Sequence, residues 1–598
     1  MCFSVSLFIP SAIVNSVRSK FSPFQYTKVL LFIVVILAAT LRFSWLGTIP
    51  YGPLVDELHF GYISYSLLQT GKDEHGISWP IVFRGFGDYK LPLYAYGTMP
   101  FVAQFGLSVF SIRALSALAG VATVATIYFL LKKLQFSESV SLFGAVVVAL
   151  LPWTVIISRI GYESNLTFAI WTCGLLVFAA FWQQRKNWML YTGAVLFGVT
   201  WYGYISYRPV SAVILILLLL LFWRTKVVSF STSLITLGIF GVVVSPFLLT
   251  LGGGSSNTAR LKQIGIFADG GVVRGIDESR NYCQEDLPRA VCDLVWNKGT
   301  VLIQTIGKRY SQTLSTDYMV FEGERSKYLD TDNAGMLYLS TSLLFFIGVL
   351  TSVQVKNRYR KLVFLAFLFL IIALFPAIIA GDHPQRVRMT PALPFFIVIA
   401  SIGLTNLLAA VQIVRKRHRK HALAGLWVVL LGMVFVESSM YLINYFTVHT
   451  KKYDSSYQAF SRDLMPYLRQ RAQGQPIYST VWFSDPVMHY AFHNSLDPAV
   501  YQQTVKLGNL EESGFQHAIS VDNFFTTQEP AIQFACDALQ KGTDGLYVTN
   551  SELEGMPADA VFFSQNKVLG YAYVYSLRRV AELQAVDCPQ EPTSNVVQ

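Results

Sequence analysis

Long apolar stretches are the feature of this sequence that most limits its fold. With 53% hydrophobic and only 14% charged residues, the 598-residue chain is too apolar for soluble cores, which stop growing near ~300 residues. A bilayer-spanning helix needs about 20 apolar residues. The chain offers eleven such stretches, so we expect an α-helical polytopic membrane protein with about 11 transmembrane helices. We predict them over residues 27–47, 111–131, 138–158, 164–182, 188–205, 208–223, 229–250, 335–354, 362–380, 390–411 and 423–446.

The basic residues between these stretches predict the orientation of the chain. The net charge is +11, and Lys and Arg gather in short loops such as the run 415–420. A nucleic-acid patch would explain that run, but a topology anchor explains all the basic loops, so we expect no nucleic-acid partner. The positive-inside rule then makes residues 1–26 a cytoplasmic lead-in and places loops 48–110 and 251–334 outside. These features are typical of a multi-pass bacterial inner-membrane protein with an extracytoplasmic active site.

Residues 447–598 differ in composition from the apolar part of the chain. Their polarity is ordinary, and helical patterns alternate with runs rich in β-branched and aromatic residues. We predict helices at 455–473 and 530–541 and strands at 476–483, 545–548 and 568–577. The chain therefore divides into a membrane core, 27–446, and a small C-terminal extracytoplasmic α/β domain, 447–598.

Four of the six cysteines lie in segments that this topology places outside, where disulfides form. Cys283 and Cys292 are close in sequence, and we predict a structural disulfide between them. Cys536 and Cys588 are a second pairing, supported only by compartment and by the number of cysteines that remain.

Two acidic positions lie at predicted outward ends of membrane helices. Asp56 and Glu57 follow the first apolar stretch among apolar and aromatic residues, and a carboxylate there can act as a general base on a hydroxyl. An exposed acidic pair at a helix start is an equal alternative. Glu163 begins the fourth stretch and is a candidate catalytic acid, or else the ion-pair partner of Arg159, four residues before it.

Four cations lie on the outward side, against the positive-inside trend: Lys90, Arg208, Arg386 and Arg388. Guanidinium groups match phosphate oxygens in a bidentate manner, and lysine binds phosphate as a point charge. Together they indicate an anionic lipid headgroup, while snorkelling at the interface is the alternative for any one of them. The sequence has no P-loop or Rossmann fingerprint, so a nucleotide-sugar donor has no recognisable binding motif.

At these residues the chain resembles the GT-C superfamily. More narrowly, it resembles the bacterial membrane glycosyltransferases related to protein O-mannosyltransferases and to the lipid A aminoarabinose transferase (glycosyltransferase family 39). The resemblance covers roughly residues 27–446. It rests on the order of the segments Val55–Glu57, Thr70–Glu74, Gly87–Tyr94, Ile112–Leu115, Ser158–Arg159 with Glu163, Phe321–Gly323 and Gly335–Tyr338.

The resemblance implies a polyprenyl-phosphate-linked sugar donor and an inverting transfer. It implies that Asp56 is the general base, that Glu163 positions the acceptor or a metal, and that Lys90 meets the lipid phosphate. Lys90 precedes Leu91 where many relatives have proline. Tyr89 stands where the aminoarabinose enzyme has an acid, so a divalent metal is left open and no other cofactor is implied.

The expected function is therefore transfer of a hexose or pentose from such a donor to an acceptor hydroxyl of a glycan, lipid or protein. A lipid or polysaccharide transporter is an alternative, and it predicts repeated halves and polar residues in the middle of the helices. A membrane sensor with an outer binding domain is a second alternative. It does not require the acidic and cationic residues to lie close together.

Overall fold

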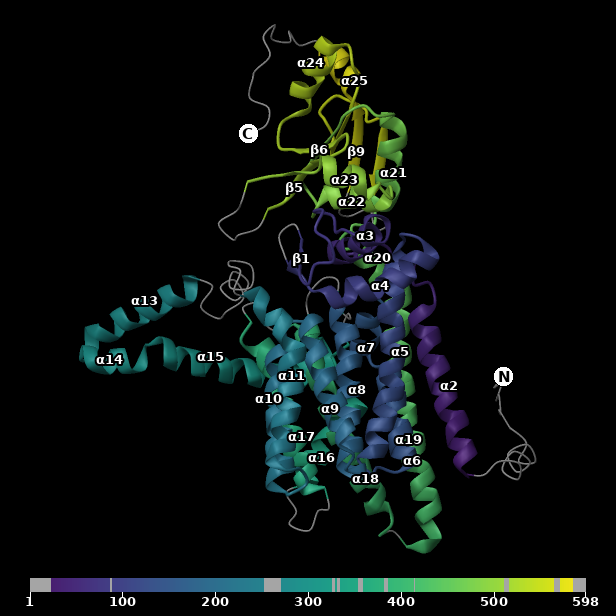
Figure 1. The fold of residues 1–598 in the computed structure, drawn as a ribbon, viewed down its shortest axis with the longest axis vertical. Helices are drawn as coiled ribbons and strands as arrows, with labels where there is room; N and C mark the ends of the chain where they lie inside the picture. The colour runs from purple at the N-terminus through teal and green to yellow at the C-terminus, as the bar shows by residue number, and fades with distance from the viewer. Residues whose placement is uncertain are drawn as a thin grey trace, which may run out of the picture.

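The computed structural model describes residues 23–85, 89–251, 270–324, 329–330, 334–352, 359–380, 385–413, 415–509, 516–563 and 571–584. Figure 1 shows a bundle of long helices with a sheet region at one end. A layer of short helices lies between bundle and sheet region, and an arm of three helices extends from the side. We call the end of the bundle beside the sheet region the sheet end.

Eight helices in the described part of the chain are long and apolar enough to cross a membrane. They agree with the predicted polytopic helical fold. They are α2 (Pro23–Phe43), α5 (Val109–Lys133), α8 (Glu163–Gln184), α10 (Tyr207–Arg224), α11 (Phe230–Leu251), α17 (Arg360–Ile378), the turn η3 (Arg386–Ala392) with α18 (Leu393–Val411), and α19 (Lys416–Asn444).

A ninth span is formed if α6 (Glu138–Leu150) and α7 (Pro152–Ser158) are counted as one, since they meet at a bend of 53°. The break lies at Leu151, whose backbone is extended (ψ 134°). Proline disfavours the helical conformation of the residue before it, so Pro152 explains why α6 stops there.

Two of the eleven predicted spans are shorter than expected. Residues 188–205 contain α9 (Asn187–Val199), which has 13 residues and ends in the turn η1 (Thr200–Tyr202). Residues 335–354 contain α16 (Leu339–Ser352), which has 14 residues. The described part of each is below the roughly 17 residues that a spanning helix needs, and α16 runs to the last residue described before position 359. Within the described residues the number of full spans is therefore eight or nine.

Small residues allow α16 and α18 to pack closely. A Cβ added to Gly348 would collide with the Ile399 carbonyl, and one added to Gly403 with the Leu344 carbonyl. Small residues at helix interfaces are the usual device by which membrane helices bring their backbones together.

The layer at the sheet end comes from the predicted loop 48–110. It contains α3 (Val55–Thr70), the antiparallel strands β1 (Phe83–Arg84) and β2 (Tyr89–Lys90), and α4 (Pro92–Phe105). The α3 helix begins where the Glu57 carboxylate accepts a hydrogen bond from the Leu54 amide at 2.8 Å. It ends at Gly71, whose φ of +69° is the left-handed conformation that glycine adopts without strain.

The sheet region has seven strands in the order β4-β5-β6-β3-β7-β9-β8, with β3 parallel to β6 and β7. The strands are β3 (Ile477–Thr480), β4 (Lys506–Leu507), β5 (Ala518–Val521), β6 (Phe524–Thr527), β7 (Leu546–Thr549), β8 (Ala560–Phe563) and β9 (Tyr571–Ser576). The helices of this region are α21 (Ser461–Ala472), α22 (Pro486–His493), α23 (Pro498–Thr504), α24 (Ala531–Lys541) and α25 (Leu577–Gln584). A mixed α/β architecture with strands in β3, β7 and β9 agrees with the sequence pattern.

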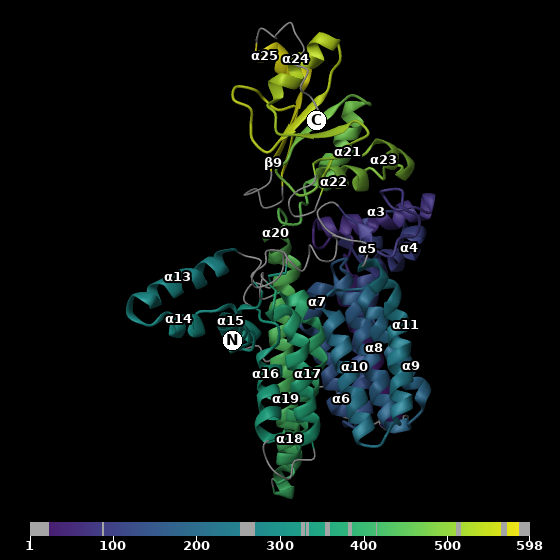
Figure 2. The ribbon, with the colours of Figure 1, turned by 60° about the vertical axis from the view of Figure 1, so that its left-hand side comes forward.

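The sheet region is packed directly on α3. Leu58 and Tyr62 of α3 belong to the same buried cluster as Val487 and Tyr490 of α22. The Tyr62 hydroxyl also donates to the Leu496 carbonyl at 3.0 Å. The helix that begins with Asp56 and Glu57 therefore has the bundle on one side and the sheet region on the other, as Figures 1 and 2 show.

The lateral arm consists of α13 (Gly270–Asp286), α14 (Arg289–Val295) and α15 (Lys298–Thr313). Cys283 of α13 and Cys292 of α14 form a disulfide, with Cα atoms 5.7 Å apart. Cys588, the suggested partner of Cys536, lies outside the described residues.

Candidate active site

Asp56 and Lys90 form an ion pair at the sheet end of the bundle. Asp56 lies in the first turn of α3 and its side chain is 35% exposed, whereas Lys90, on β2, is buried. The Lys90 ammonium also lies 5.9 Å from the centre of the Phe60 ring, one helical turn after Asp56. Because residues four apart share a helix face, β2 covers the face of α3 that carries Asp56.

Glu57 lies in a different environment from its neighbour. Its carboxylate is fully buried and accepts two hydrogen bonds from Arg113 of α5, from Nε at 2.7 Å and from Nη2 at 2.9 Å. The remaining Arg113 donors reach the carbonyls of Leu46, Pro50 and Gly52. Each nitrogen of the Arg113 guanidinium thus donates a hydrogen bond. The bidentate pair joins α5 to α3 and can hold the layer of short helices in place.

Gly161 connects this pair to the start of α8. Its amide donates to Glu57 Oε1 at 2.6 Å, and a Cβ at this position would lie 2.9 Å from the Ile112 carbonyl. The Tyr94 hydroxyl donates to the same carbonyl at 2.6 Å. Burial, together with the negative charges of Glu57 and Glu163, raises the pKa of Tyr94 well above its usual value. Glu163 therefore lies within electrostatic reach of the Glu57 cluster, at the half-buried first turn of α8.

The alternative that Arg159 is the ion-pair partner of Glu163 is not supported. The Arg159 guanidinium donates to the carbonyls of Leu41, Arg42 and Ile49, at 2.6, 3.1 and 3.0 Å. It also lies 4.7 Å from the centre of the Phe446 ring. Arg159 therefore joins the end of α2 to the turn Tyr445–His449 that follows α19.

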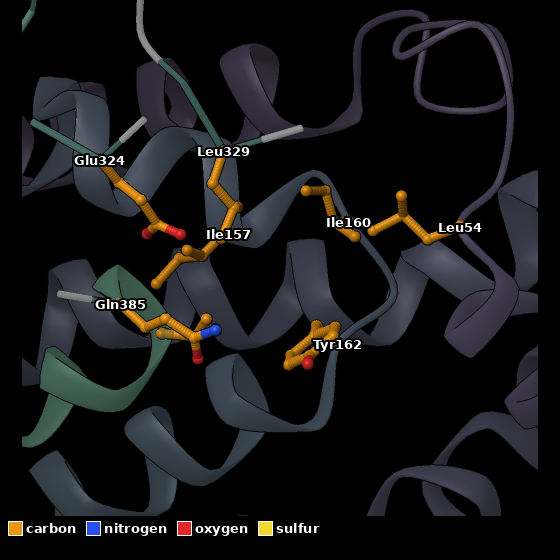
Figure 3. A pocket seen from close by; sticks show the side chains of 8 residues that line it. Leu54, Ile157, Ile160, Tyr162, Glu324, Leu329 and Gln385 are labelled. Carbon is orange, nitrogen blue, oxygen red and sulfur yellow. The ribbon is translucent and has the colours of Figure 1, made fainter. Parts of the chain in front are cut away.

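A small cavity of about 40 Å³ lies next to the first turn of α3 and the start of α8, and Figure 3 shows the side chains around it. Its lining comes from four separate segments of the chain: Leu54; Ile157, Ile160 and Tyr162; Glu324 and Leu329; and Gln385 and Val387. Leu54 precedes Asp56 by two positions, and Tyr162 immediately precedes Glu163. Gln385 and Val387 flank Arg386. The fold therefore gathers three of the predicted site segments around one cavity.

Arg386 and Arg388 lie in η3, and both are buried. The Arg386 amide donates to Glu324 Oε2 at 2.6 Å, which connects η3 to the acid that lines the cavity. The Arg388 amide donates to the Gln385 carbonyl at 3.2 Å. Figure 3 shows Glu324 and Gln385 on one side of the cavity and Leu54 and Ile160 on the other.

Arg208 lies in the first turn of α10, at the edge of this arrangement. Its Nε donates to the Trp201 carbonyl at 3.2 Å, and its guanidinium lies 4.0 Å from the centre of the Phe247 ring. Tyr204, one turn earlier, contacts Tyr162 of the cavity wall with ring centres 6.1 Å apart. The start of α10 is thus near the cavity, with Arg208 turned toward α11.

Sequence reasoning assigned no role to Arg113 or Glu324. Arg113 was noted only as part of a resembling segment, although a charge in the first turn of an apolar helix is a signal that it has a buried partner. Glu324 comes directly after the noted segment Phe321–Gly323. Its contact with Arg386 spans 62 positions, so no local pattern could have revealed it.

His59 of α3 binds the sheet region. Its Nε2 lies 2.8 Å from Asp485 Oδ2, and its Nδ1 lies 3.9 Å from Glu74 Oε1. Burial disfavours the charged ring, but the two carboxylates outweigh burial and raise the pKa of His59 to about 9. Among the described residues, no group of three or more His, Cys, Asp or Glu side chains is arranged to hold a metal ion.

The fold and this site define a polytopic membrane protein with a polar cluster at one end of its bundle. Residues 90–249 match the family model described as dolichyl-phosphate-mannose-protein mannosyltransferase. This match confirms the predicted resemblance to GT-C membrane glycosyltransferases over that segment. The segment begins at Lys90 and includes Glu163 and Arg208.

The solved structures with a similar fold include two that cover most of this chain. ArnT from Cupriavidus metallidurans bound to undecaprenyl phosphate is 11% identical, with 93% of this chain and 98% of that chain covered and a TM-score of 0.48. The archaeal oligosaccharyltransferase AglB from Archaeoglobus fulgidus, in complex with an inhibitory peptide and a dolichol-phosphate, is 12% identical, with coverages of 88% and 70% and a TM-score of 0.49. The comparison with curated proteins gives no match.

Proposed function

We propose that this protein transfers a sugar from a polyprenyl-phosphate-linked donor to an acceptor hydroxyl, with inversion, at the extracytoplasmic face of the bacterial inner membrane. The observation that carries the proposal is the Asp56–Lys90 ion pair, two positions along the chain from Leu54, which lines a cavity together with the neighbours of Glu163 and Arg386. The family match adds support, because that family is named for a lipid-phosphate-linked mannose donor.

Asp56 is the proposed general base. Its carboxylate is partly exposed and its contact with Lys90 is an ion pair, which an entering substrate can rearrange. In the proposed step the acceptor oxygen attacks the anomeric carbon while its proton passes to Asp56. The bond from that carbon to the phosphate oxygen breaks, and polyprenyl phosphate leaves. General-base assistance of this kind is typically worth ~10²–10⁴-fold in rate.

Lys90 is the proposed contact of the donor phosphate. A buried ammonium next to the base brings the leaving phosphate and the acceptor hydroxyl to the same place, and it stabilises the negative charge that develops on the phosphate. Arg386 and Arg388, buried in η3 on either side of the cavity-lining Val387, are proposed to add positive charge for the phosphate. Arg208 is proposed for the lipid phosphate on its charge and its place at the start of α10.

The other predicted acids take supporting roles in this proposal. Glu57 acts through Arg113 as a positioning residue that holds the first turn of α3, and Glu163 orients the acceptor hydroxyl. Residues 27–446 form the transferring core. Residues 447–598, outside the membrane, hold α3 from the other side.

The experiment is a comparison of lipid-linked sugars by mass spectrometry in membranes from cells that express the native chain or Asp56→Asn. The account predicts that a polyprenyl-phosphate sugar is consumed with the native protein and accumulates with the variant. Asp522→Asn is the matched control: this exposed aspartate lies in the sheet region, and asparagine tolerates its φ of +52°. Equal lipid-sugar profiles in all three membranes, with equal amounts of inserted protein, would overturn the proposal.

A further inference from the structure

The arm formed by α13, α14 and α15 carries several exposed large apolar side chains. Six of its large apolar side chains are exposed, among them Leu294 at 73% and Ile303 at 72%. Leu287, Val291, Leu294 and Val295 lie together at the tip, where α13 joins α14. Contiguous exposed apolar residues of this kind mark a surface that binds a partner or a membrane.

The contacts between α15 and α17 show at which height along the bundle the arm is attached. The Tyr310 hydroxyl of α15 donates to the Ile371 carbonyl of α17 at 2.8 Å, and Arg309 donates to the Ile378 carbonyl at 2.8 Å. Ile371 lies seven residues before the sheet end of α17, which is about 10 Å along the helix at 1.5 Å per residue. The arm therefore leaves the bundle beside a spanning helix and below that helix's end.

The direction of the arm agrees with this level. Figures 1 and 2, which differ by a turn of 60°, both show it extending sideways from the bundle and away from the sheet region. An element at this level that points outward from a membrane protein meets the lipid beside it.

The charges of the arm favour the membrane interface over the hydrocarbon core. Its basic residues are Arg274, Arg280, Arg289, Lys298, Lys308 and Arg309, and its acidic residues are Asp277, Glu278, Glu285, Asp286 and Asp293. Several of them pair with each other, as Arg280 does with Asp277 and Asp293. Amphipathic helices with one apolar and one charged face lie in the interfacial plane.

We propose that residues 270–313 are a membrane-surface arm that rests in the lipid interface at the sheet-end side of the bilayer, with the apolar tip around Leu294 embedded among the lipids. The Cys283–Cys292 disulfide ties α13 to α14 and holds the tip together. The C-terminal end of the arm continues through η2 (Asp317–Glu322) to Glu324 in the cavity wall. Lipid contact at the tip therefore steadies the segment that carries this wall.

The test uses the full chain in nanodiscs of phosphatidylethanolamine and phosphatidylglycerol. A benzophenone amino acid replaces Leu294 or, in a second variant, Ile303. The matched control carries it at Val481, an exposed apolar residue (56%) in the sheet region. After irradiation, mass spectrometry identifies the adducts on each peptide, and an intact Cys283–Cys292 disulfide reports that the arm is folded.

The expected result is at least about tenfold more phospholipid adduct at Leu294 and Ile303 than at Val481, the factor that corresponds to burying one such side chain in lipid. Equal adduct levels at the three positions would overturn the proposal. Crosslinks from Leu294 to a second copy of the chain in place of lipid would also overturn it.

Discussion

Asp56 and Glu57 are neighbours in the first turn of α3, yet their carboxylates lie in two different regions of the molecule. Glu57 points into the bundle and is held by Arg113, Gly161 and the Leu54 amide, with no exposed surface. Asp56 is partly exposed, pairs with Lys90 and follows Leu54 of the cavity wall by two positions.

The difference teaches how one helical turn serves both structure and chemistry. A buried carboxylate whose oxygens are all bonded cannot accept a substrate proton without breaking those bonds, but removing it leaves charged partners uncompensated. A partly exposed carboxylate can exchange its partner for a substrate. The comparison therefore predicts that changes around Glu57 act on folding and that changes at Asp56 act on transfer.

The largest expected effect on stability is that of Arg113→Ala. This change leaves Glu57 buried without its cation, and breaking a buried pair in this way costs about 3–5 kcal/mol. Thermal unfolding of the purified protein in detergent should show a much lower midpoint for Arg113→Ala. Arg113→Lys keeps the positive charge but loses the bidentate contact. Its unfolding midpoint should therefore lie between those of the native protein and Arg113→Ala. An Arg113→Ala protein that melts like the native chain would break the comparison.

His59 extends the comparison one turn further along α3, to the sheet region. Its pKa of about 9 lies above the ordinary value of about 6.5, so the ion pair with Asp485 stabilises the fold fully below pH ~6.5. That contribution is lost as the pH rises through about 9. Besides Asp485 and Glu74, the Lys90 ammonium acts on His59 and lowers its pKa.

The pH dependence is measured with native protein and with Asp485→Asn. The difference between their unfolding midpoints should be largest near pH 6 and should shrink toward pH 9.5. A difference that does not change with pH would show that the His59–Asp485 contact is not an ion pair.

Glu163→Gln should have the smallest effect of these changes. The proposed contribution of Glu163 is one hydrogen bond to the acceptor, and such a bond is worth about 0.5–1.5 kcal/mol. Transfer should fall by no more than about tenfold, mainly through a higher KM for the acceptor, with the unfolding midpoint unchanged. A loss as large as that of Asp56→Asn would instead make Glu163 part of the proton transfer.

Much of the fold follows from local patterns in the sequence. Apolar length predicts the membrane helices, because the bilayer requires about 20 apolar residues whatever surrounds them. Among the described residues eight helices, or nine with the bent pair α6 and α7, are long enough to span, and composition alone did not reveal that α9 ends after 13 residues. The strands β3, β7 and β9 were recognisable from runs of β-branched and aromatic residues. Their pairing, with β3 between β6 and β7, depends on contacts distant in sequence.

The candidate site was predictable only in part. Asp56 and Lys90 stand out because they are charged residues close to membrane ends, and the structure pairs them across 34 positions. Glu57 has the same sequence signal as Asp56. What distinguishes Glu57 from Asp56 is its buried environment, above all the contact with Arg113, 56 positions away. The local sequence indicates which side chains are unusual at a membrane edge. Which of them become buried depends on the packing of helices that are distant in the sequence.

The most direct test is the rate of sugar transfer by purified Asp56→Asn in nanodiscs, with the donor identified from the membrane lipids and with unfolding midpoints measured in parallel. The account predicts a loss of ~10²–10⁴-fold in rate with the midpoint unchanged, since Asp56 acts on the substrate and contributes little to the fold. Transfer at the native rate by a folded Asp56→Asn protein would contradict the claim that this carboxylate is the general base.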